Sequence, residues 1–416
     1  MHVLMVSEYF PPHTMGGGEL SAFALAKALV KRKTAVSVLT GYIPGDHVRE
    51  TIAGVIVYRR LATGNALTVL GNIERFRFTH SVRKELLKLI DEIQPDILHA
   101  MNVTSMPGVA AVAQRRGIPA VAHINSPLAF DPKATLLEDG KEATRPYTLL
   151  RFVRSFLTAR ELGRRGNAWY LKYNPLAWVI IYRRWSRIRD SFSEFDLFMP
   201  ISTAMQRWLE RYGVPTKKTV VIPNIIGTGT FPEASPPTNK TAKIVYLSGY
   251  SRMKGLHVVL DALKGVKGAY ELHCSGIGDE RASLEAQAMK NRVAAVFHGL
   301  MTEDNELKLL AGADLLVFPS LVPEGLGRVA LAAMALSKPV VASRIGGITD
   351  TVVDNRTGLL VEPGNVEAWH SAINALVRDP RKRRAMGAAG KRRFNAGFTE
   401  EAIVHKALTA YRGILS

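Results

Sequence analysis

Residues 323–365 read PEGLGRVALAAMALSKPVVASRIGGITDTVVDNRTGLLVEPGN, and this stretch decides the fold. It holds two short apolar runs of the β type, Pro339–Ala342 and Gly358–Val361, and a helical pattern precedes the first of them. Glu324 lies in a glycine-containing loop immediately before that helical pattern. Helices that alternate with short apolar strands are typical of a parallel sheet. The stretch therefore predicts an α/β fold with a carboxylate in the loop before a helix.

The same alternation continues outward through most of the chain. Helical patterns such as Glu19–Lys31 and Ser81–Ile93 separate the short apolar runs. This order predicts parallel sheets made of βαβ units. The expected strands are Val3–Val6, Ala35–Leu39, Val55–Tyr58, Ile97–Ala100, Ala120–His123, Leu197–Met199, Val220–Ile222, Lys243–Leu247, Tyr270–Cys274, Ala295–His298, Leu315–Phe318, Pro339–Ala342 and Gly358–Val361.

The alternation breaks at residues 224–242, which are rich in Pro, Thr, Gly and Asn. Such a composition is typical of a linker between two similar α/β halves. We therefore expect a first domain over residues 1–223, a second over 243–397 and a last helix over 398–416. Two doubly wound, Rossmann-like domains that face each other create a central cleft at the carboxyl ends of their strands, where ligands bind.

The composition of the 416 residues excludes several classes of protein. With 47% hydrophobic residues, the chain can bury full cores, which excludes intrinsic disorder. A single cysteine, Cys274, excludes a disulfide scaffold and suits a reducing cytoplasm. The first residues resemble a strand rather than a signal peptide, and no apolar run approaches the roughly 18 residues that span a membrane. No cluster of metal-ligand residues is visible, so no metal is expected.

The net charge of +19 is concentrated in residues 141–190. This stretch has twelve Lys or Arg against three acids, which leaves +9, and it holds three of the five tryptophans. Two helical patterns there each place basic residues beside an aromatic face. Basic amphipathic helices of this kind are typical of contact with an anionic membrane surface. The residues expected to make this contact are Phe152, Arg154, Trp169, Trp178, Arg183, Arg184 and Trp185.

Two other interpretations of this basic stretch remain open. The two patterns can be ordinary helices with a core face and a solvated basic face. Nucleic-acid binding is the less favoured interpretation, because no zinc-finger spacing or aromatic RNA-binding signature accompanies the charge. The membrane interpretation predicts a cytoplasmic protein, bound peripherally at the inner face of the membrane and without a nucleic-acid partner.

Three motifs carry chemistry, and the first is the loop FPPHTMGGGEL after the first strand. Gly16, Gly17 and Gly18 stand just before a helix, where glycines allow a ligand to approach and the helix N-terminus favours an anion. A dinucleotide fingerprint does not fit, because its third glycine position is Ser21 and the second strand ends Leu-Thr-Gly without an acid. A plain tight turn is the alternative.

The second motif, YLSGYSRMKGLHVVLDAL, places Arg252 and Lys254 between a strand and a helix. Two cations and several glycines suit a diphosphate, which needs donors and countercharge when it leaves. The alternative is that this basic loop is only a solvated turn. The third motif is the loop of Glu324, whose carboxylate can accept hydrogen bonds from sugar hydroxyls.

Together, these motifs make the chain resemble glycosyltransferase family 4, the retaining glycosyltransferases of the GT-B fold. The similarity is densest in residues 323–365, and it includes MVSEYFPPHTMGGGELSAFALAKAL, PDILHA and DPRKRRAMGAAG elsewhere in the chain. The resemblance implies an acceptor domain first, a nucleotide-sugar domain second, and a final helix that crosses back to the first domain.

The resemblance also implies roles for particular residues. His123 would contact the transferred sugar, Lys254 and Arg252 would hold the diphosphate, and Glu324 would bind sugar hydroxyls. His99 would face the acceptor, although a lone histidine at a strand end is otherwise more often structural. The residues near the donor would be Gly17, Gly18, Gly249, Gly276, Gly278, His298, Gly325, Leu326 and Gly327.

The sequence departs from the family pattern at two positions. The family has a second glutamate eight residues after the first, which binds the ribose, and Ala332 stands there. The family also has an arginine after the glycine of the phosphate strand, where this chain has Gly249. These departures keep open a non-catalytic GT-B protein that binds a sugar or a nucleotide as a partner subunit.

The mechanism implied by the family keeps the anomeric configuration and needs no carboxylate nucleophile, metal or cofactor. The main task of the protein would be electrostatic stabilisation of the leaving diphosphate. We expect a hexosyltransferase that uses GDP-mannose, or next a UDP-sugar, and a lipid-linked or membrane-borne glycan acceptor.

Overall fold

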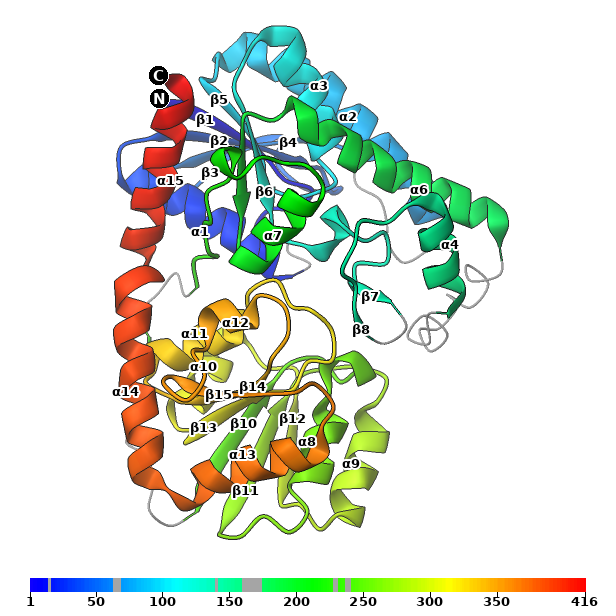
Figure 1. Cartoon of the computed structure of the whole chain (residues 1–416). Coiled ribbons are helices and arrows are strands. Elements are labelled where there is room, and N and C mark those ends of the chain that lie inside the picture. Colours follow the sequence, from blue (N-terminus) through cyan, green and yellow to red (C-terminus); the bar gives the residue numbers. More distant parts are fainter. Residues whose placement is uncertain (14–15, 63–68, 139–140, 159–173, 227–230, 236–240) are drawn as a thin grey trace. The chain divides into compact units, whose positions relative to one another are not determined.

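The computed structural model describes residues 1–416 except 14–15, 63–68, 139–140, 159–173, 227–230 and 236–240. The chain forms two compact units (Figure 1). Unit 1 comprises residues 1–225 and 400–416, and unit 2 comprises residues 226–399. The chain therefore re-enters unit 1 with its last helix.

Unit 1 is built on a seven-stranded sheet with the order β3-β4-β2-β1-β5-β6-β9. Strand β3 runs antiparallel to β4, and the other neighbouring strands are parallel. All residues of β5, β6 and β9 are buried, because helices cover both faces of the sheet. The strands are β1 (His2–Val6), β2 (Ala35–Gly41), β3 (Arg49–Ile52), β4 (Val55–Leu61), β5 (Ile97–Ala100), β6 (Ala120–Ile124), β9 (Leu197–Pro200) and the separate hairpin β7 (Leu137–Glu138) with β8 (Lys141–Glu142).

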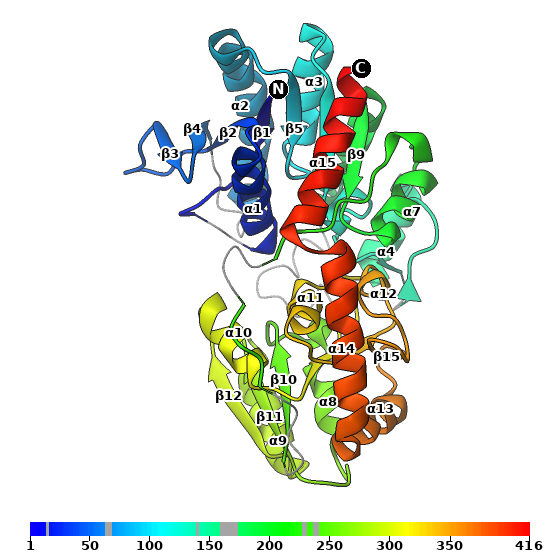
Figure 2. The same ribbon diagram turned by 90° about the vertical axis from the view of Figure 1, so that its left-hand side faces the viewer.

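Helices α1 and α15 pack side by side on one face of this sheet, as Figure 2 shows, and α2 and α3 pack on the other. The core between α1, α15 and the sheet is apolar, with Val3, Met5 and Val121 from the strands. The helices of unit 1 are α1 (Gly17–Lys31), α2 (Val69–Ile93), α3 (Met106–Arg116), α4 (Leu149–Thr158), α6 (Pro175–Asp190), α7 (Thr203–Arg211), α15 (Glu400–Leu415) and the short 3-10 turns η1 (Pro127–Ala129), η4 (Ser191–Glu194) and η5 (Thr216–Lys218).

Unit 2 is a six-stranded parallel sheet with the order β12-β11-β10-β13-β14-β15. Its first strand lies inside the sheet, so the strand order reverses between β10 and β13. The same reversal occurs between β1 and β5 in unit 1. The strands of unit 2 are β10 (Ala242–Leu247), β11 (Tyr270–Ser275), β12 (Ala295–Gly299), β13 (Leu315–Phe318), β14 (Val340–Ser343) and β15 (Gly358–Val361).

The helices of unit 2 follow its strands in alternation, which confirms the prediction of two doubly wound α/β domains. Polar side chains cap several of them. Thr302 accepts the N–H of Asn305 at the start of α10, and Asn365 accepts that of Ala368 at the start of α13. The helices are η6 (Arg252–Lys254), α8 (Leu256–Ala262), α9 (Arg281–Lys290), α10 (Glu303–Ala311), α11 (Arg328–Ala335), α12 (Ile348–Thr351), α13 (Val366–Arg378) and α14 (Pro380–Gly397).

One predicted strand, Val220–Ile222, is wrong. The run belongs to unit 1, where the N–H groups of Val220 and Ile222 donate to the carbonyls of Phe198 and Pro200 beside β9. It is irregular in conformation, because it follows the edge of that sheet for only a few residues before Pro223. An apolar run of three residues fits a short strand and a buried irregular segment equally well.

The basic stretch 141–190 contains α4 and α6, but two of its aromatic residues are not at the surface. Phe152 is fully buried and Trp185 nearly so. Tyr182 lies between them, with its ring centroid 5.7 Å from that of Phe152 and 5.6 Å from that of Trp185. Trp185 in turn lies 6.1 Å from Tyr212, which follows α7. These aromatic faces pack into unit 1, so the predictions that Phe152 and Trp185 contact a membrane are wrong.

Other residues of the same stretch do reach the surface. Arg154 and Arg183 are exposed, whereas Trp178 and Arg184 are half-buried. Trp169 lies outside the described residues. Apolar side chains that the prediction omitted are also exposed, namely Leu149, Leu150 and Leu157 on α4 and Leu176 and Val179 on α6.

Candidate functional site

The candidate site of unit 2 lies at the point where its strand order reverses. In a doubly wound sheet, ligands bind beyond the carboxyl ends of the two strands that flank this reversal. Lys254 lies in the loop after β10, and Glu324 lies in the loop after β13. The two side chains meet, with Lys254 Nζ 2.6 Å from Glu324 Oε1. The fold thus brings together two predicted residues that are 70 positions apart.

The Glu324 carboxylate is held from one side. Ser320 Oγ donates to Oε1 at 2.8 Å, and Lys254 donates to the same oxygen. In the part of the chain that the structure describes, Oε2 accepts no hydrogen bond. Both groups are partly exposed, so they are open to a ligand. A lysine next to a carboxylate with one unbonded oxygen can bind a phosphate and a sugar hydroxyl together.

Glycines bring the two loops close enough for this contact. The N–H of Leu321 donates to the carbonyl of Met253 at 2.8 Å, which joins the loops directly. Gly255 has φ +73°, and a Cβ there would lie 1.9 Å from the carbonyl oxygen of Pro319. A side chain at position 255 would therefore separate Lys254 from Glu324.

Arg252 begins the 3-10 turn that carries Lys254, and its side chain is exposed. Among the described residues it forms no ion pair, so its charge remains available to an anion. The carbonyl of Gly249 accepts the hydroxyl of Tyr246 at 2.8 Å, which anchors the start of the same loop. Arg252 therefore lies on the loop that lacks the arginine expected at position 249.

Gly276 and Gly278 follow β11 with φ of +150° and +157°. A Cβ at Gly276 would lie 2.0 Å from the carbonyl oxygen of Ser248, and one at Gly278 would lie 2.2 Å from that of Tyr250. These glycines allow the loops after β10 and β11 to pack against each other. Their contact with a nucleotide base stays a prediction.

Replacing Gly276 by alanine is expected to lower the free energy of unfolding by about 2 kcal/mol or more, because the methyl group would overlap a backbone carbonyl. Gly265→Ala is the matched control, since Gly265 also has a positive φ of +77° but has no atom within 4 Å of the added Cβ. Denaturant unfolding of both variants measures the difference. Equal losses would mean that backbone strain, and not the packing of the loops, requires glycine at position 276.

Residues after Glu324 shape the loop mainly through their backbone. Leu326 is buried, and its carbonyl accepts the hydroxyl of Thr351 at 2.6 Å. Gly327 has φ +80° at the start of α11, where a Cβ would lie 2.5 Å from the side chain of Ile348. The carbonyl of Glu324 itself accepts the N–H of Gly347 at 2.7 Å. Gly325, between Glu324 and Leu326, belongs to this same anchored loop.

His298 lies on β12, as the predicted strand Ala295–His298 has it. Its Nε2 is 3.0 Å from Nδ1 of His273 on β11, and the two rings stack with centroids 5.3 Å apart. His298 is exposed at the edge of the sheet. The imidazole is thus paired with a neighbouring strand, and its contact with the donor stays a prediction.

Ala332, where the family has its second glutamate, lies in the second turn of α11 and is largely buried. Arg328 stands one helical turn before it, and its guanidinium lies 3.5 Å from Glu303 of the neighbouring helix α10. Glu306 of the same helix accepts the hydroxyl of Ser275 at 2.8 Å. Burial raises the pKa of Glu306. Glu303 of α10 therefore lies beside the start of α11, a contact that the sequence pattern did not indicate.

The carboxyl ends of β1 and β5 form the corresponding point of unit 1. Glu8 follows β1 and accepts the hydroxyl of Thr104 at 2.8 Å, across the reversal of strand order. Gly17 and Gly18 start α1, and a Cβ at Gly18 would lie 3.2 Å from Nδ2 of Asn125 after β6. Glu8 was not named as a site residue from the sequence, although an acid directly after the first strand is a pattern that could have indicated it.

His123 and His99 are both buried in unit 1. His123 is 4% exposed at the end of β6, whereas His99 is fully buried and bonded to Tyr411 of α15. The prediction that His99 faces the acceptor does not fit this position, because no part of its ring reaches the surface of unit 1. A strand-end position in the sequence does not reveal which helix covers the side chain.

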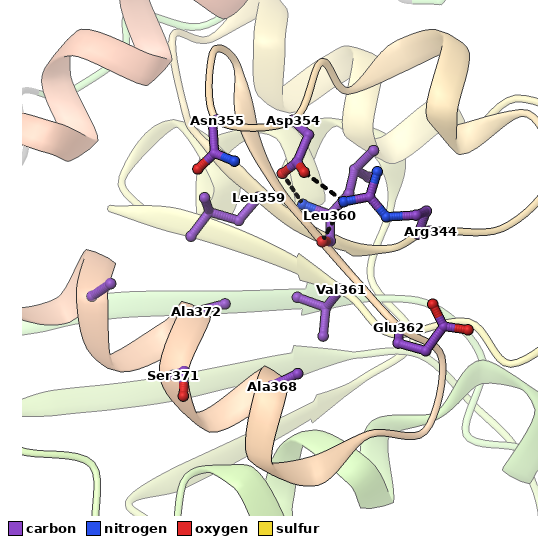
Figure 3. Close-up of a pocket in the computed structure, with 11 residues that line it drawn as sticks. Arg344, Asp354, Asn355, Leu359, Leu360, Val361, Glu362, Ala368, Ser371 and Ala372 are labelled. Carbon is purple, nitrogen blue, oxygen red and sulfur yellow. Dashed lines mark hydrogen bonds and ion pairs between the residues drawn. The ribbon is translucent and has the colours of Figure 1, made fainter.

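A cavity of about 520 Å³ lies elsewhere in unit 2, between β15 and α13 (Figure 3). None of the predicted site residues lines it. Figure 3 shows Arg344 beside Asp354, which also accepts the N–H of Leu360 at 2.9 Å. Arg344 also donates to the carbonyl of Leu360 at 3.1 Å, so both backbone groups of this residue on the edge strand β15 are bonded by side chains.

Neither a metal site nor a membrane-spanning helix occurs in the described ranges. No three or more His, Cys, Asp or Glu side chains gather there as a metal would require. None of the helices there combines the length and the apolar character that crossing a bilayer needs.

Comparison with protein families gives two matches. Residues 15–229 match the family described as Glycosyltransferase Family 4, and residues 229–393 match the family described as Glycosyl transferases group 1. The chain is 25% identical over 431 aligned positions to a glycogen synthase of Mycobacterium tuberculosis, covering 99% of this chain and 94% of the other.

Another relative is the GDP-mannose-dependent alpha-(1-6)-phosphatidylinositol monomannoside mannosyltransferase of Mycolicibacterium smegmatis. It is 30% identical over 207 positions, 47% of this chain and 48% of that protein. Among solved structures, a sucrose-phosphate synthase from Thermosynechococcus elongatus aligns with a TM-score of 0.74 at 20% identity, over 99% of this chain and 98% of the other. The Anabaena protein HepE in complex with UDP and glucose aligns at 0.67 and 19%, over 99% and 100%. These likenesses confirm the predicted GT-B fold.

Proposed function

The chain belongs to glycosyltransferase family 4, and from this premise we propose that it is a retaining hexosyltransferase that uses a nucleotide-diphosphate sugar. The observation that carries the proposal is the contact of Lys254 with Glu324 at the reversal of strand order in unit 2. One group can hold a leaving diphosphate, and the other can hold hydroxyls of the sugar attached to it. Neither role requires a metal ion or a cofactor.

The reaction that this pair supports is a substitution at the anomeric carbon. The bond from that carbon to the phosphate oxygen breaks, and a bond to the acceptor oxygen forms on the same face. The proton of the acceptor hydroxyl passes to the leaving phosphate oxygen. Lys254 and the exposed Arg252 stabilise the negative charge that develops on the diphosphate. Glu324 positions the sugar through its unbonded oxygen.

For the donor we propose GDP-mannose, with a UDP-sugar as the second candidate. The relative that depends on GDP-mannose supports the first, and it aligns with 47% of this chain. The similar structure of HepE in complex with UDP and glucose supports a UDP-sugar as the second candidate. Ala332 is the reason for a third candidate, a non-catalytic subunit that binds a sugar or nucleotide, because the family's ribose carboxylate is absent there.

Calorimetric titration with GDP, UDP and ADP and with their sugar conjugates tests the proposal. We expect one nucleotide to bind, and Ala332→Glu to tighten this binding by about tenfold, because a carboxylate can then accept ribose hydroxyls. An unchanged affinity in Ala332→Glu would mean that another residue already binds the ribose. Binding of no nucleotide by the wild-type protein would contradict the proposed activity and favour the non-catalytic subunit.

We also propose that unit 1 binds an anionic membrane surface at the inner face of the membrane, where a lipid-linked acceptor would lie. The support now comes from residues other than the buried aromatics. Leu150 is 80% exposed on α4 and Leu176 is 68% exposed on α6, and the same helices expose Arg154 and Arg183. Exposed apolar side chains next to arginines suit a lipid interface.

Replacing Leu150 and Leu176 by aspartate is expected to weaken binding to anionic vesicles by at least about tenfold, because apolar insertion is lost and negative charge is added. Sedimentation with phosphatidylglycerol vesicles measures this, and phosphatidylcholine vesicles give the uncharged reference. The control replaces the exposed Arg381 and Arg384 of α14 by glutamine, which removes charge from another basic helix. Unchanged binding of the aspartate variant would refute the membrane proposal.

A further inference from the structure

Three polar side chains lie together in the apolar core of unit 1, namely His99 on β5, His123 on β6 and Tyr411 on α15. His99 pairs with Val121 across the two strands, so His123 is its diagonal neighbour on the same face of the sheet. The two imidazole centroids are 5.5 Å apart. This is the face covered by α1 and α15, whose apolar side chains pack there against the strands.

A hydrogen bond links this pair to the last helix. Nδ1 of His99 is 2.7 Å from the hydroxyl of Tyr411, and both side chains are fully buried. Two further ring nitrogens, Nε2 of His99 and Nδ1 of His123, are buried without a hydrogen-bond partner in the described part of the chain. Unpaired buried polar atoms are costly, so their protonation states are constrained.

All three groups are electrically neutral near pH 7. Burial lowers the pKa of His99 well below its usual value, and the neighbouring His123 lowers it further. Burial lowers the pKa of His123 to about 4. Burial raises the pKa of Tyr411, so its hydroxyl keeps its proton. Each neutral imidazole therefore carries a single N–H, on one nitrogen or the other.

The bond between Tyr411 and His99 fixes the tautomer of His99 once the donor is chosen, and we take the tyrosine hydroxyl as the donor. If the Tyr411 hydroxyl donates to Nδ1 of His99, the proton of His99 resides on Nε2. Nδ1 of His123, on the neighbouring ring, is also buried without a partner, and we therefore leave it as an acceptor, because a second unpaired N–H group would add a further desolvation cost. The proton of His123 is thereby placed on its Nε2, which is not among the buried nitrogens without a partner.

We infer that Tyr411 and His99 are positioning residues that hold His123 in the tautomer with its proton on Nε2, ready to donate to the transferred sugar. The inference rests on the proposed sugar transfer and on the role that the family resemblance implies for His123, but the proton order itself rests on neither. In this inference, helix α15 positions a site residue as well as packing on the sheet of unit 1. The hydroxyl that sets the order reaches β5 from residue 411, which is 312 positions away in the chain.

The test is an imidazole nitrogen NMR spectrum of the full chain with labelled histidine at pH 7. The wild-type protein is expected to show His123, identified by loss of its signals in His123→Gln, as a single neutral tautomer protonated on Nε2. Tyr411→Phe removes only the hydroxyl and is expected to shift His123 toward a mixture of tautomers. Tyr147→Phe is the matched control, because it removes another buried hydroxyl of unit 1, one that bonds to the carbonyl of Leu137.

A His123 spectrum that is the same in Tyr411→Phe and the wild-type protein overturns the inference. If Tyr411→Phe does not fold, His99→Gln breaks the same link from the other side and is judged by the same signals. With the nucleotide sugar that binds in calorimetry, Tyr411→Phe is expected to lower kcat about tenfold without changing KM for the donor. Absence of turnover in the wild-type protein would contradict the proposed function alone, because the spectra still decide the proton order.

Discussion

Replacing Lys254 by methionine is expected to lower kcat for sugar transfer by at least about 100-fold, the usual effect of removing one group that stabilises developing negative charge. The Lys254 ammonium lies 2.6 Å from Glu324 at the ends of β10 and β13, and the length of methionine preserves the packing of the stem. Glu324→Gln keeps the size of the side chain but removes the charge that Lys254 and Ser320 both contact. It is expected to have an effect of similar size.

Both variants are measured by initial rates with the donor identified in calorimetry, and by thermal unfolding to confirm that they fold. The control is Glu285→Gln, which breaks the surface ion pair of Glu285 with Arg281 on α9, 2.8 Å long in the same unit. That variant is expected to retain its rate. Near-normal rates in both Lys254→Met and Glu324→Gln would remove this pair from the reaction and with it the main support for the site.

Replacing Trp185 by alanine is expected to lower the free energy of unfolding of unit 1 by about 3–5 kcal/mol, because a large buried aromatic side chain leaves a cavity. Trp185 is 2% exposed and lies against Tyr182 and Tyr212. It anchors α6 to the rest of unit 1. The membrane interpretation of the sequence predicts the opposite, a loss of vesicle binding with little loss of stability.

Chemical denaturation measures the change in stability, and vesicle sedimentation of the folded variant measures the change in binding. Trp178→Ala is the matched control, since Trp178 lies two turns earlier on the same helix and is only half-buried. It is expected to cost far less stability. A Trp185→Ala protein as stable as the wild type would show that the aromatic contacts of α6 do not hold the helix in place.

The alternation of apolar runs and helical patterns was sufficient to predict two doubly wound domains. Parallel strands covered on both faces are mainly apolar, so β13 and, despite His99 and His123, β5 and β6 are visible in the sequence alone. Glu324 and Lys254 were each predicted in a loop after a strand, but their contact was not, because it depends on the strand order of the folded sheet. Loops after the strands that flank a reversal of strand order meet at one place in every doubly wound sheet.

The sequence could not predict whether the apolar face of a helix packs into the protein core or faces a membrane. The spacing of Phe152 and Trp185 shows that an apolar face exists, but a protein core and a membrane satisfy the same spacing equally well. Only the packed structure shows that these faces are turned inward to Tyr182 and Tyr212, while Leu150 and Leu176 remain at the surface.

The sequence by itself therefore determined the fold class, the order of the elements and the loop positions of Lys254 and Glu324, because these depend on local periodicity and on spacing along the chain. Only the tertiary structure decided that glycines 276 and 278 serve the packing of two loops, and that Tyr411 reaches His99. These contacts join residues that are far apart in the chain. Their geometry depends on how the helices and strands pack, so it cannot be predicted from local sequence.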